Sequence, residues 1–275
     1  MISVNHRVDD LRLIFSEYIL YPMTSFELDK FFKNLLDIES FDKIDSSLNG
    51  LQVDNDGSDI KKIAFAVDAN LETFKRASRA KANMLFVHHG LFWGQALRLV
   101  GNHRKRLDFL LKNNIALYGV HLPLDQNPKF GNNIILANLL GIIDPQPFGT
   151  YNGKKLGYKG NLAKPLTIEE ATKRISFMNR DPLGVYPFGV KENQTVALIS
   201  GGAAKSVLEA IAENVDLYVT GDMVHSIYNE CLEAEINMIA GGHYSTEVWG
   251  VRKIMEECTN QLKIDVEFID VPTGL

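Results

Sequence analysis

Short apolar runs that suit buried strands alternate with amphipathic stretches along most of this chain. The apolar runs lie at residues 63–67, 84–87, 115–120, 195–199, 216–219, 238–240 and 266–269. Parallel strands need long crossover connections, usually helices, so repeated strand–helix units favour parallel sheets with helices on both faces. We therefore expect an α/β fold with mostly parallel sheets covered by helices.

The middle of the chain departs from this alternation. Residues 144–164 are rich in Gly, Pro and Asn, which indicates a boundary or an irregular crossover. On either side, Thr24 to Glu27 and Thr167 to Glu170 fit capping boxes and predict helix starts. With 275 residues, of which 45% are hydrophobic, the chain is long enough for one large domain or two smaller ones.

Polar side chains follow nearly every predicted strand. They are Asp68, the His88–His89 pair, His121, Asp222 after a Thr-Gly turn, and His243 after a Gly-Gly turn. In parallel α/β sheets, ligands bind beyond the carboxyl ends of the strands. We therefore expect the functional site at this edge of the sheet.

Two of these strand ends carry candidate metal ligands. His88 and His89 lie where a strand ends, so the backbone can turn both imidazoles toward one site. Imidazole suits zinc, iron and manganese, although each ring alone also fits a hydrogen bond to the backbone. After the next strand, Asp125 is a candidate ligand, and His121 is a candidate ligand, outer-sphere donor or acid–base group.

A third segment adds one nitrogen and one oxygen donor. If a helix begins near Tyr244, His243 and Glu247 lie four residues apart on one face of its first turn. Glu247 then serves either as a metal ligand or as a carboxylate that favours the helix start. At another strand-to-helix turn, Asp222 either caps the helix or belongs to the site, and His225 is a candidate for lining the pocket or binding phosphate.

Together, His88, His89, Asp125, His243 and Glu247 form a mixed nitrogen and oxygen donor set. Five protein ligands exceed the needs of a structural zinc and suit two divalent ions that share a carboxylate, with Glu247 as the natural bridge. Zinc, manganese, iron and cobalt all accept such donors. Two ions polarise a phosphoryl or carbonyl oxygen and generate hydroxide near neutral pH, which is hydrolytic chemistry.

Composition argues against several other classes of protein. The formal net charge is −5, which disfavours a general nucleic-acid binder. No apolar run reaches the length of a membrane span, and the charged N-terminal stretch does not resemble a secretory leader. The two cysteines, Cys231 and Cys258, form no paired motif. We expect a cytoplasmic protein with no membrane partner.

Several motifs resemble those of the NGG-interacting-factor-like dinuclear metal-centre family, whose members are also called type 2 homologues of GTP cyclohydrolase I. These motifs are LNGLQV at 48–53, VHHGLFW at 87–93, YGVHLPLD at 118–125, GNNIILA at 131–137, ISGGAA at 199–204, VTGD at 219–222, GHYSTE at 242–247 and FIDVP at 268–272. The resemblance spans nearly the whole chain. It departs at the C-terminus, where PTGL replaces the Asn-Pro ending that is usual in the family.

The resemblance carries expectations about the site and the assembly. It places the family's metal ligands on the five donors already named, and it implies a toroidal homohexamer whose metal sites face an internal cavity. It also implies a two-lobed subunit without an inserted domain. The first lobe would comprise residues 1–125 and 243–275, with the C-terminal segment returning to it, and the second lobe residues 126–242.

These observations predict a metal-dependent hydrolase that acts on a nucleotide or a related phosphorylated or cyclic small molecule. In this hypothesis His121 or His225 transfers protons and Phe92 and Trp93 stack on a base, and ring opening of GTP is one version of the reaction. One rival hypothesis is a non-enzymatic metal-binding scaffold with a regulatory or metal-handling role. The other is a nucleic-acid-binding ring, which the net acidity disfavours.

Overall fold

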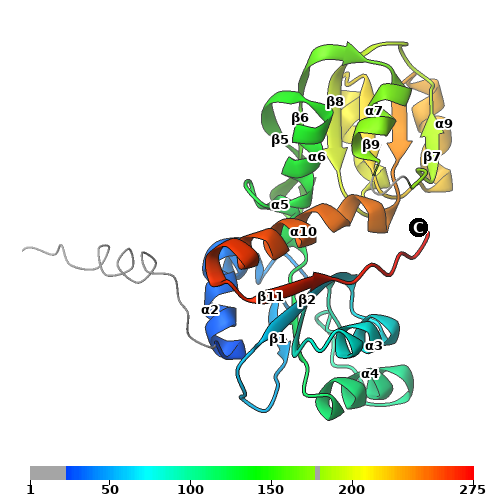
Figure 1. Ribbon diagram of the computed structural model, residues 1–275. Coiled ribbons are helices and arrows are strands. Elements are labelled where there is room, and N and C mark those ends of the chain that lie inside the picture. Colours follow the sequence, from blue (N-terminus) through cyan, green and yellow to red (C-terminus); the bar gives the residue numbers. More distant parts are fainter. Residues whose placement is uncertain (1–22, 177–179) are drawn as a thin grey trace, which may run out of the picture.

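The computed structural model describes residues 23–176 and 180–275, which form two β-sheets and their surrounding helices (Figure 1). The first sheet has the strand order β1-β4-β3-β2-β11. Its strands are β1 (Gly50–Val53), β2 (Lys62–Asp68), β3 (Met84–His89), β4 (Ala116–Gly119) and β11 (Asp265–Phe268). All are parallel except β1, which is antiparallel to β4. The carboxyl ends of β2, β3 and β4 therefore meet at one edge, as predicted.

Helices cover both faces of the first sheet because its strands direct alternate side chains to opposite sides. These helices are α2 (Ser25–Leu36), α3 (Leu71–Arg79), α4 (Gly101–Lys112) and α10 (His243–Leu262), with a short 3-10 helix η1 (Ile38–Phe41) after α2. In β2, Ile63 and Phe65 pack in the core shared with α2 and α10. Ala64 and Ala66 pack in the core shared with α3 and α4. The predicted capping box at Thr24 begins α2.

The second sheet has the strand order β5-β6-β8-β9-β10-β7. Its strands are β5 (Ile142–Tyr151), β6 (Lys154–Leu166), β7 (Gly184–Tyr186), β8 (Asn193–Ile199), β9 (Leu217–Thr220) and β10 (Asn237–Ala240). The helices of this part are α5 (Leu122–Gln126), α6 (Asn132–Leu140), α7 (Ile168–Ile175), α8 (Val207–Ala212) and α9 (His225–Glu233), with the 3-10 helix η2 (Ala204–Ser206). The central strands β8, β9 and β10 are parallel, and the flanking pairings are antiparallel. The α/β class is confirmed, and this sheet is mixed rather than mostly parallel.

The segment at 144–164 is not the boundary or irregular crossover that its composition indicates. It forms most of an antiparallel hairpin of β5 and β6. At the turn, Asn152 and Gly153 both have positive φ (45° and 84°), as tight hairpin turns require. Pro145 and Pro147 are compatible with β5 because this strand lies at the sheet edge, where a missing backbone donor costs little. The Asn-Gly pair was therefore the informative signal, and the overall Gly and Pro content was misleading.

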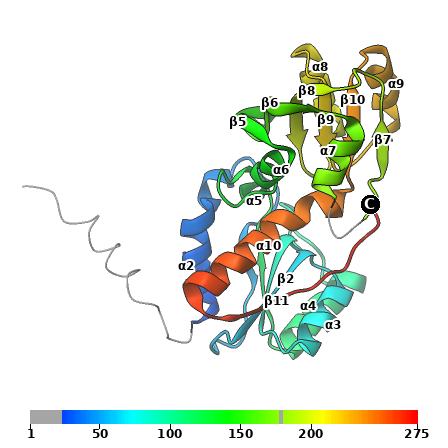
Figure 2. The ribbon, with the colours of Figure 1, turned by 45° about the horizontal axis from the view of Figure 1, so that its top comes forward.

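Helix α10 connects the two sheets. It begins soon after β10 ends, and Val251, Ile254 and Cys258 on α10 pack in the core of the first sheet. The chain then forms β11 beside β2, so the C-terminal segment returns to the first sheet, as expected (Figure 2). Near the chain end, the amide of Tyr244 donates to the carbonyl of Leu275 (3.1 Å), which brings the last residues to the start of α10.

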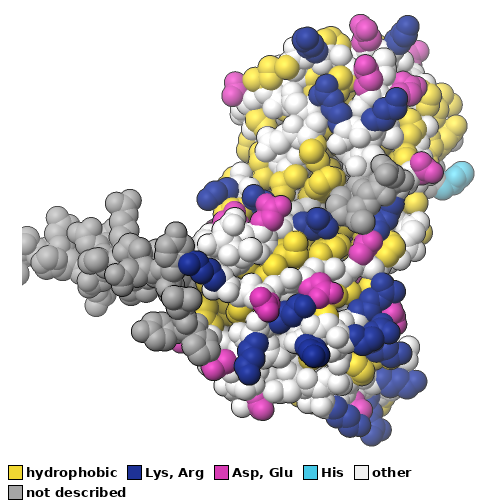
Figure 3. Space-filling model, viewed as in Figure 1, with side chains coloured by type: hydrophobic (Ala, Val, Ile, Leu, Met, Phe, Trp, Pro, Cys, Tyr) yellow, Lys and Arg dark blue, Asp and Glu magenta, His cyan; other side chains and the backbone are white. Residues whose placement is uncertain are grey.

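Two properties of the described residues bear on the partners of this chain. In the described part, no helix combines the length and apolarity that a membrane span needs. Lys and Arg side chains gather over α3 and α4 (Figure 3), so the mild net acidity is distributed unevenly. The expectation that the N-terminal stretch is no secretory leader concerns residues outside the described ranges. The lobe boundaries after residues 125 and 242 stay a prediction.

Candidate metal centre

His88 and His89 end strand β3, and the neighbouring strand ends hold them in place. The carbonyl of His89 accepts a hydrogen bond from the amide of Ala69 (2.8 Å), just after β2. The carbonyl of Val87 accepts one from the amide of Val120 (2.9 Å), just after β4. The two imidazole rings lie 4.6 Å apart between centroids, so the end of one strand brings both rings to the same place.

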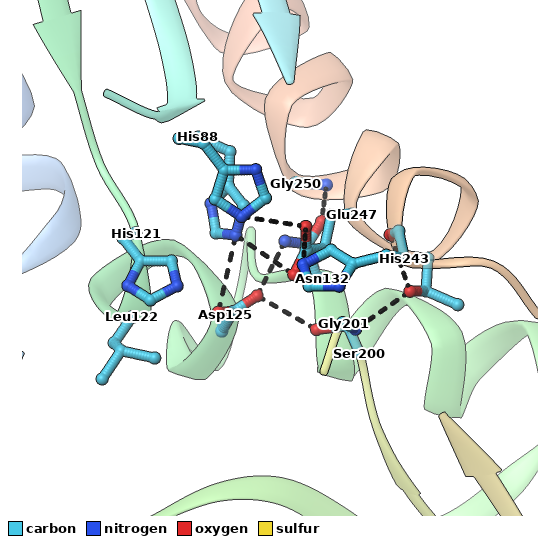
Figure 4. Close-up of polar contacts among 12 residues, drawn as sticks. His88, His121, Leu122, Asp125, Asn132, Ser200, Gly201, His243, Glu247 and Gly250 are labelled. Carbon is cyan, nitrogen blue, oxygen red and sulfur yellow. Dashed lines mark hydrogen bonds and ion pairs between the residues drawn. The ribbon is translucent and has the colours of Figure 1, made fainter. Parts of the chain in front are cut away.

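His88 is fully buried, and its Nε2 atom faces two carboxylates. Its Nδ1 lies 2.9 Å from the carbonyl oxygen of Val120, and because a carbonyl only accepts, Nδ1 donates and Nε2 is left without a proton in the neutral ring. Nε2 lies 3.6 Å from Oδ2 of Asp125 and 3.5 Å from Oε1 of Glu247 (Figure 4). This buried nitrogen has no hydrogen-bond partner among the described residues, which is costly unless a cation binds there.

His89 and His243 converge on the other oxygen of the same glutamate. Their Nε2 atoms lie 3.2 Å and 3.3 Å from Oε2 of Glu247. Their Nδ1 atoms donate to the carboxylates of Asp68 (2.8 Å) and Asp222 (2.9 Å). Pairs of this kind fix the imidazole orientation and raise the basicity of the opposite nitrogen, as they do around metal ions.

Glu247 lies at the centre of the cluster. It follows His243 by four residues on α10, and its side chain is only 3% exposed. Burial raises the pKa of Glu247, but the nearby charges of His88 and His89 outweigh burial and hold the pKa well below its ordinary value. Gly201 makes room for this side chain, since a Cβ there would collide with Oε1 of Glu247. An ionised carboxylate thus directs its two oxygens at three imidazoles.

Asp125 contributes one free oxygen to the cluster. It lies on the short helix α5 and is buried. Its Oδ1 accepts hydrogen bonds from the Asn132 amide (2.9 Å) and the Ser200 hydroxyl (3.0 Å). These two bonds leave Oδ2 directed at His88 (Figure 4). The five predicted ligands therefore lie together.

His121 flanks the same cluster. It follows β4, and its ring centroid lies 5.1 Å from that of His88 and 5.7 Å from that of His89. Its Nδ1 donates to Oδ1 of Asp45 (2.9 Å), whose other oxygen accepts from the amide of Leu122 (3.0 Å). Burial raises the pKa of Asp45, but the hydrogen bond and charge of His121, together with hydrogen bonds from Asn49 and Ser47, outweigh burial and leave the pKa below its ordinary value.

The predicted aromatic pair is divided between the site and the core. The ring of Trp93 lies 4.9 Å from that of His121 and 6.0 Å from that of His89, so it borders the cluster. Phe92 instead packs edge-on against His103, beside α3 and α4. Trp93 is therefore the aromatic side chain that borders the cluster.

The structure separates the two residues of the Asp222–His225 segment. Asp222 orients His243, and it does not cap α9, whose N-cap is Val224. His225 is exposed at the first position of α9, and no contact within the described part links it to the cluster.

The donor set suits divalent cations. Three overlapping groups have ligand atoms within 4.8 Å of one another: His88, His89 and His121; His89, His243 and Glu247; and His88, Asp125 and Glu247. Burial lowers the pKa of His88, but the carboxylates of Asp125 and Glu247 outweigh burial and raise the pKa to about 9. Glu247 and Asp222 likewise outweigh burial and raise the pKa of His243 to about 10. Protons thus supply the positive charge that metal ions would supply.

Sequence reasoning missed three supporting residues. Asn132 and Ser200 belong to recognised motifs but were not assigned to the site, and Asp45 lies in no motif. Their roles arise from contacts between residues that are separated in sequence. Asn132 lies 7 residues from its partner Asp125, and Ser200 lies 75 residues from Asp125. Asp45 lies 76 residues from its partner His121. Only the presence of each residue near a glycine or asparagine turn was available as a signal.

Known proteins are similar to this chain in sequence and in fold. The profile of the DUF34/NIF3 (NGG1p interacting factor 3) family matches residues 23–274. A protein of Treponema pallidum (strain Nichols) described as a GTP cyclohydrolase 1 type 2 homolog is 37% identical, over 92% of this chain and 100% of its own. A protein of Archaeoglobus fulgidus with the same description is 38% identical, over 90% of this chain and 98% of its own. A crystal structure of a Thermus thermophilus protein aligns with a TM-score of 0.82 and 35% identity, covering 92% of this chain and 100% of its own. The chain therefore belongs to the DUF34/NIF3 family.

Proposed function

We propose that this chain holds a dinuclear metal centre bridged by Glu247. One ion would bind His88 Nε2, Asp125 Oδ2 and Glu247 Oε1, and the other would bind His89 Nε2, His243 Nε2 and Glu247 Oε2. The observation that carries the proposal is the buried, ionised Glu247, whose two oxygens face different imidazoles at 3.2 to 3.5 Å. Three protein donors per ion leave positions for water and substrate, as in catalytic rather than structural sites.

The chemistry of such a centre is hydrolysis. When bound, paired divalent ions polarise a substrate oxygen and lower the pKa of water. Residues of the chain itself would transfer protons and position the substrate. His121, held by Asp45, would accept or donate a proton at Nε2, and Trp93 would pack against a planar part of the substrate. His225 takes no part in this proposal, because it is exposed and makes no contact with the cluster within the described part of the chain.

The substrate class that we propose is a nucleotide or a related small molecule. Support comes from the relatives that are described as GTP cyclohydrolase 1 type 2 homologs. GTP is therefore the first compound to test, followed by other nucleotides, nucleosides and cyclic amides. The full chain, loaded separately with zinc, manganese, iron or cobalt, would be incubated with each compound and the products separated by chromatography.

This screen also separates the enzyme from a metal-binding scaffold. Turnover by wild type that is lost in Glu247→Ala supports the hydrolase. If metal-loaded protein with about two ions per chain turns over no compound, the hydrolase proposal is wrong and the scaffold is favoured. Rapid exchange of the bound ions with free chelator would then point to metal handling.

The assembly and its location complete the proposal. By resemblance to the family, we propose a cytoplasmic homohexamer built from two-lobed subunits, with residues 1–125 and 243–275 in one lobe and 126–242 in the other. All five proposed ligands would then belong to the first lobe, because α10 begins at His243 and carries Glu247 toward β3. The second lobe would contribute Ser200, which donates to Asp125, and Gly201, which makes room for Glu247.

A further inference from the structure

Three of the histidines form a group of their own. Ligand atoms of His88, His89 and His121 lie within 4.8 Å of one another. In each ring Nδ1 is already engaged, by the Val120 carbonyl, the Asp68 carboxylate and the Asp45 carboxylate respectively. The nitrogen that remains for a ligand is therefore Nε2 in all three rings.

These three imidazoles come from a single sheet edge. His88 and His89 end β3, and His121 follows β4, which pairs with β3 in parallel register. The bridged centre proposed above instead requires Asp125 from α5 and His243 and Glu247 from α10. The three-histidine group thus depends on fewer elements than the bridged centre.

The two arrangements compete for the same atoms. His88 and His89 belong to the three-histidine group and also to the bridged centre. Each Nε2 has one lone pair and binds one ion at a time. An ion that takes all three histidines therefore leaves the bridged pair without a histidine from β3.

We propose that the cluster has a second coordination mode, in which a single ion binds His88, His89 and His121, and Asp45 is the positioning residue for His121. This inference rests on the proposed function, since it describes a second loading state of the same cluster. Three imidazoles with an open fourth position suit Cu²⁺, Ni²⁺ and Zn²⁺, whereas carboxylate-rich sets favour Mn²⁺. The identity and amount of metal would then select between a mononuclear and a dinuclear state.

The test uses Cu²⁺ at one equivalent and a readout independent of activity. Metal-free full chain would receive one equivalent of Cu²⁺, and pulsed EPR would count the coordinated imidazoles. We expect three in the wild type and two in His121→Ala, with affinity for Cu²⁺ reduced tenfold or more. His243→Ala is the matched control, because it removes a ligand of the bridged centre only, and it should keep three. His121→Gln, checked by circular dichroism, repeats the loss with a side chain of similar size.

Each other outcome has a defined meaning. If the count is unchanged in folded His121→Gln, or if His243→Ala lowers it at one equivalent, the three-histidine mode is wrong while the bridged centre stands. If wild type binds no Cu²⁺ above background, the three-histidine mode is wrong, and the content of zinc, manganese, iron or cobalt per chain then decides the bridged centre separately. If Asp45→Asn binds Cu²⁺ like wild type while remaining folded, the positioning role of Asp45 is wrong.

Discussion

At the scale of single residues, the cluster is organised by hydrogen bonds that point away from its centre. Each imidazole donates through Nδ1 to an outer acceptor, and this leaves Nε2 for the interior. The ligand types were predictable, because His and Asp or Glu after strand ends are recognisable in sequence. The outer acceptor Asp45 was not predictable, because its partner His121 is 76 residues away and no local pattern links them.

The first residue-scale prediction concerns Asp222. Replacing Asp222 by Ala removes the acceptor that orients His243, and outer partners of metal-bound histidines typically contribute about 10- to 100-fold in metal affinity. We expect a loss in that range for the ion bound by His243, measured by competition with a chromophoric chelator. Asp108→Ala, on the exposed surface of α4, is the control and should not change the affinity. Equal affinities for all three proteins would rule out the orienting role.

The second residue-scale prediction concerns pH and the metal-free protein. The folded-state pKa values of His88 and His243 are raised from 6.5 to about 9 and about 10. Groups with raised pKa stabilise the fold fully below their unfolded pKa, and this contribution is lost as the pH rises through the folded pKa. Glu247, with its lowered pKa, stabilises the fold above 4.5 and loses this effect as the pH falls.

Denaturant titration of metal-free protein from pH 4 to 10 would show in which direction the free energy of unfolding changes with pH. We expect the free energy of unfolding to fall between about pH 6.5 and pH 10. His243→Ala should show a smaller fall over the same window, because one of the two raised groups is gone. A free energy that stays level in wild type from pH 6.5 to 10 would contradict the account.

At the scale of secondary-structure elements, glycine turns make space for the bridging carboxylate. Gly201 follows β8 with φ +64°, and a side chain there would collide with Glu247. The strand ends around this turn were predicted from the apolar runs, since period and length identify buried strands. The β5–β6 hairpin was missed because Pro and Gly on an edge strand resemble a loop in composition.

An element-scale prediction follows from Gly201. Gly201→Ala should displace the Glu247 side chain and lower the metal content below that of wild type. Gly57→Ala is the matched control, because Gly57 also has a positive φ (+84°) but no neighbour within 4 Å. Both substitutions should cost about 1 kcal/mol or more in backbone strain, and only Gly201→Ala should lose metal. Elemental analysis of both variants would decide, and full metal content in folded Gly201→Ala would be evidence against the proposed bridge.

At the scale of the whole molecule, α10 joins the two sheets and carries two of the proposed ligands. The α/β class could be predicted from the alternation of strands and helices, and the return of the C-terminal segment from the family resemblance. The mixed pairing of the second sheet could not, because pairing direction depends on contacts between distant segments. The concentration of Lys and Arg over α3 and α4 was also hidden by the net charge of −5 (Figure 3).

The whole-molecule prediction is the assembly. Sedimentation equilibrium of the full chain should give a mass near six times 30.8 kDa. A monomer or dimer at micromolar concentration would exclude the proposed hexamer and would leave the proposal of a metal centre unaffected.

Repeating the sedimentation run with added DNA or RNA would test the remaining nucleic-acid hypothesis, because an electrostatic complex should weaken with salt.

The central claim is the bridged dinuclear centre, and metal content per chain tests it most directly. Purified, chelator-free wild type and Glu247→Ala would be reconstituted with each candidate metal, and bound metal measured by elemental analysis, with circular dichroism to confirm folding. The account predicts about two ions per wild-type chain and a clear loss in the variant, because Glu247 contributes an oxygen to each ion. No metal above background in wild type, or two ions retained by folded Glu247→Ala, would contradict it.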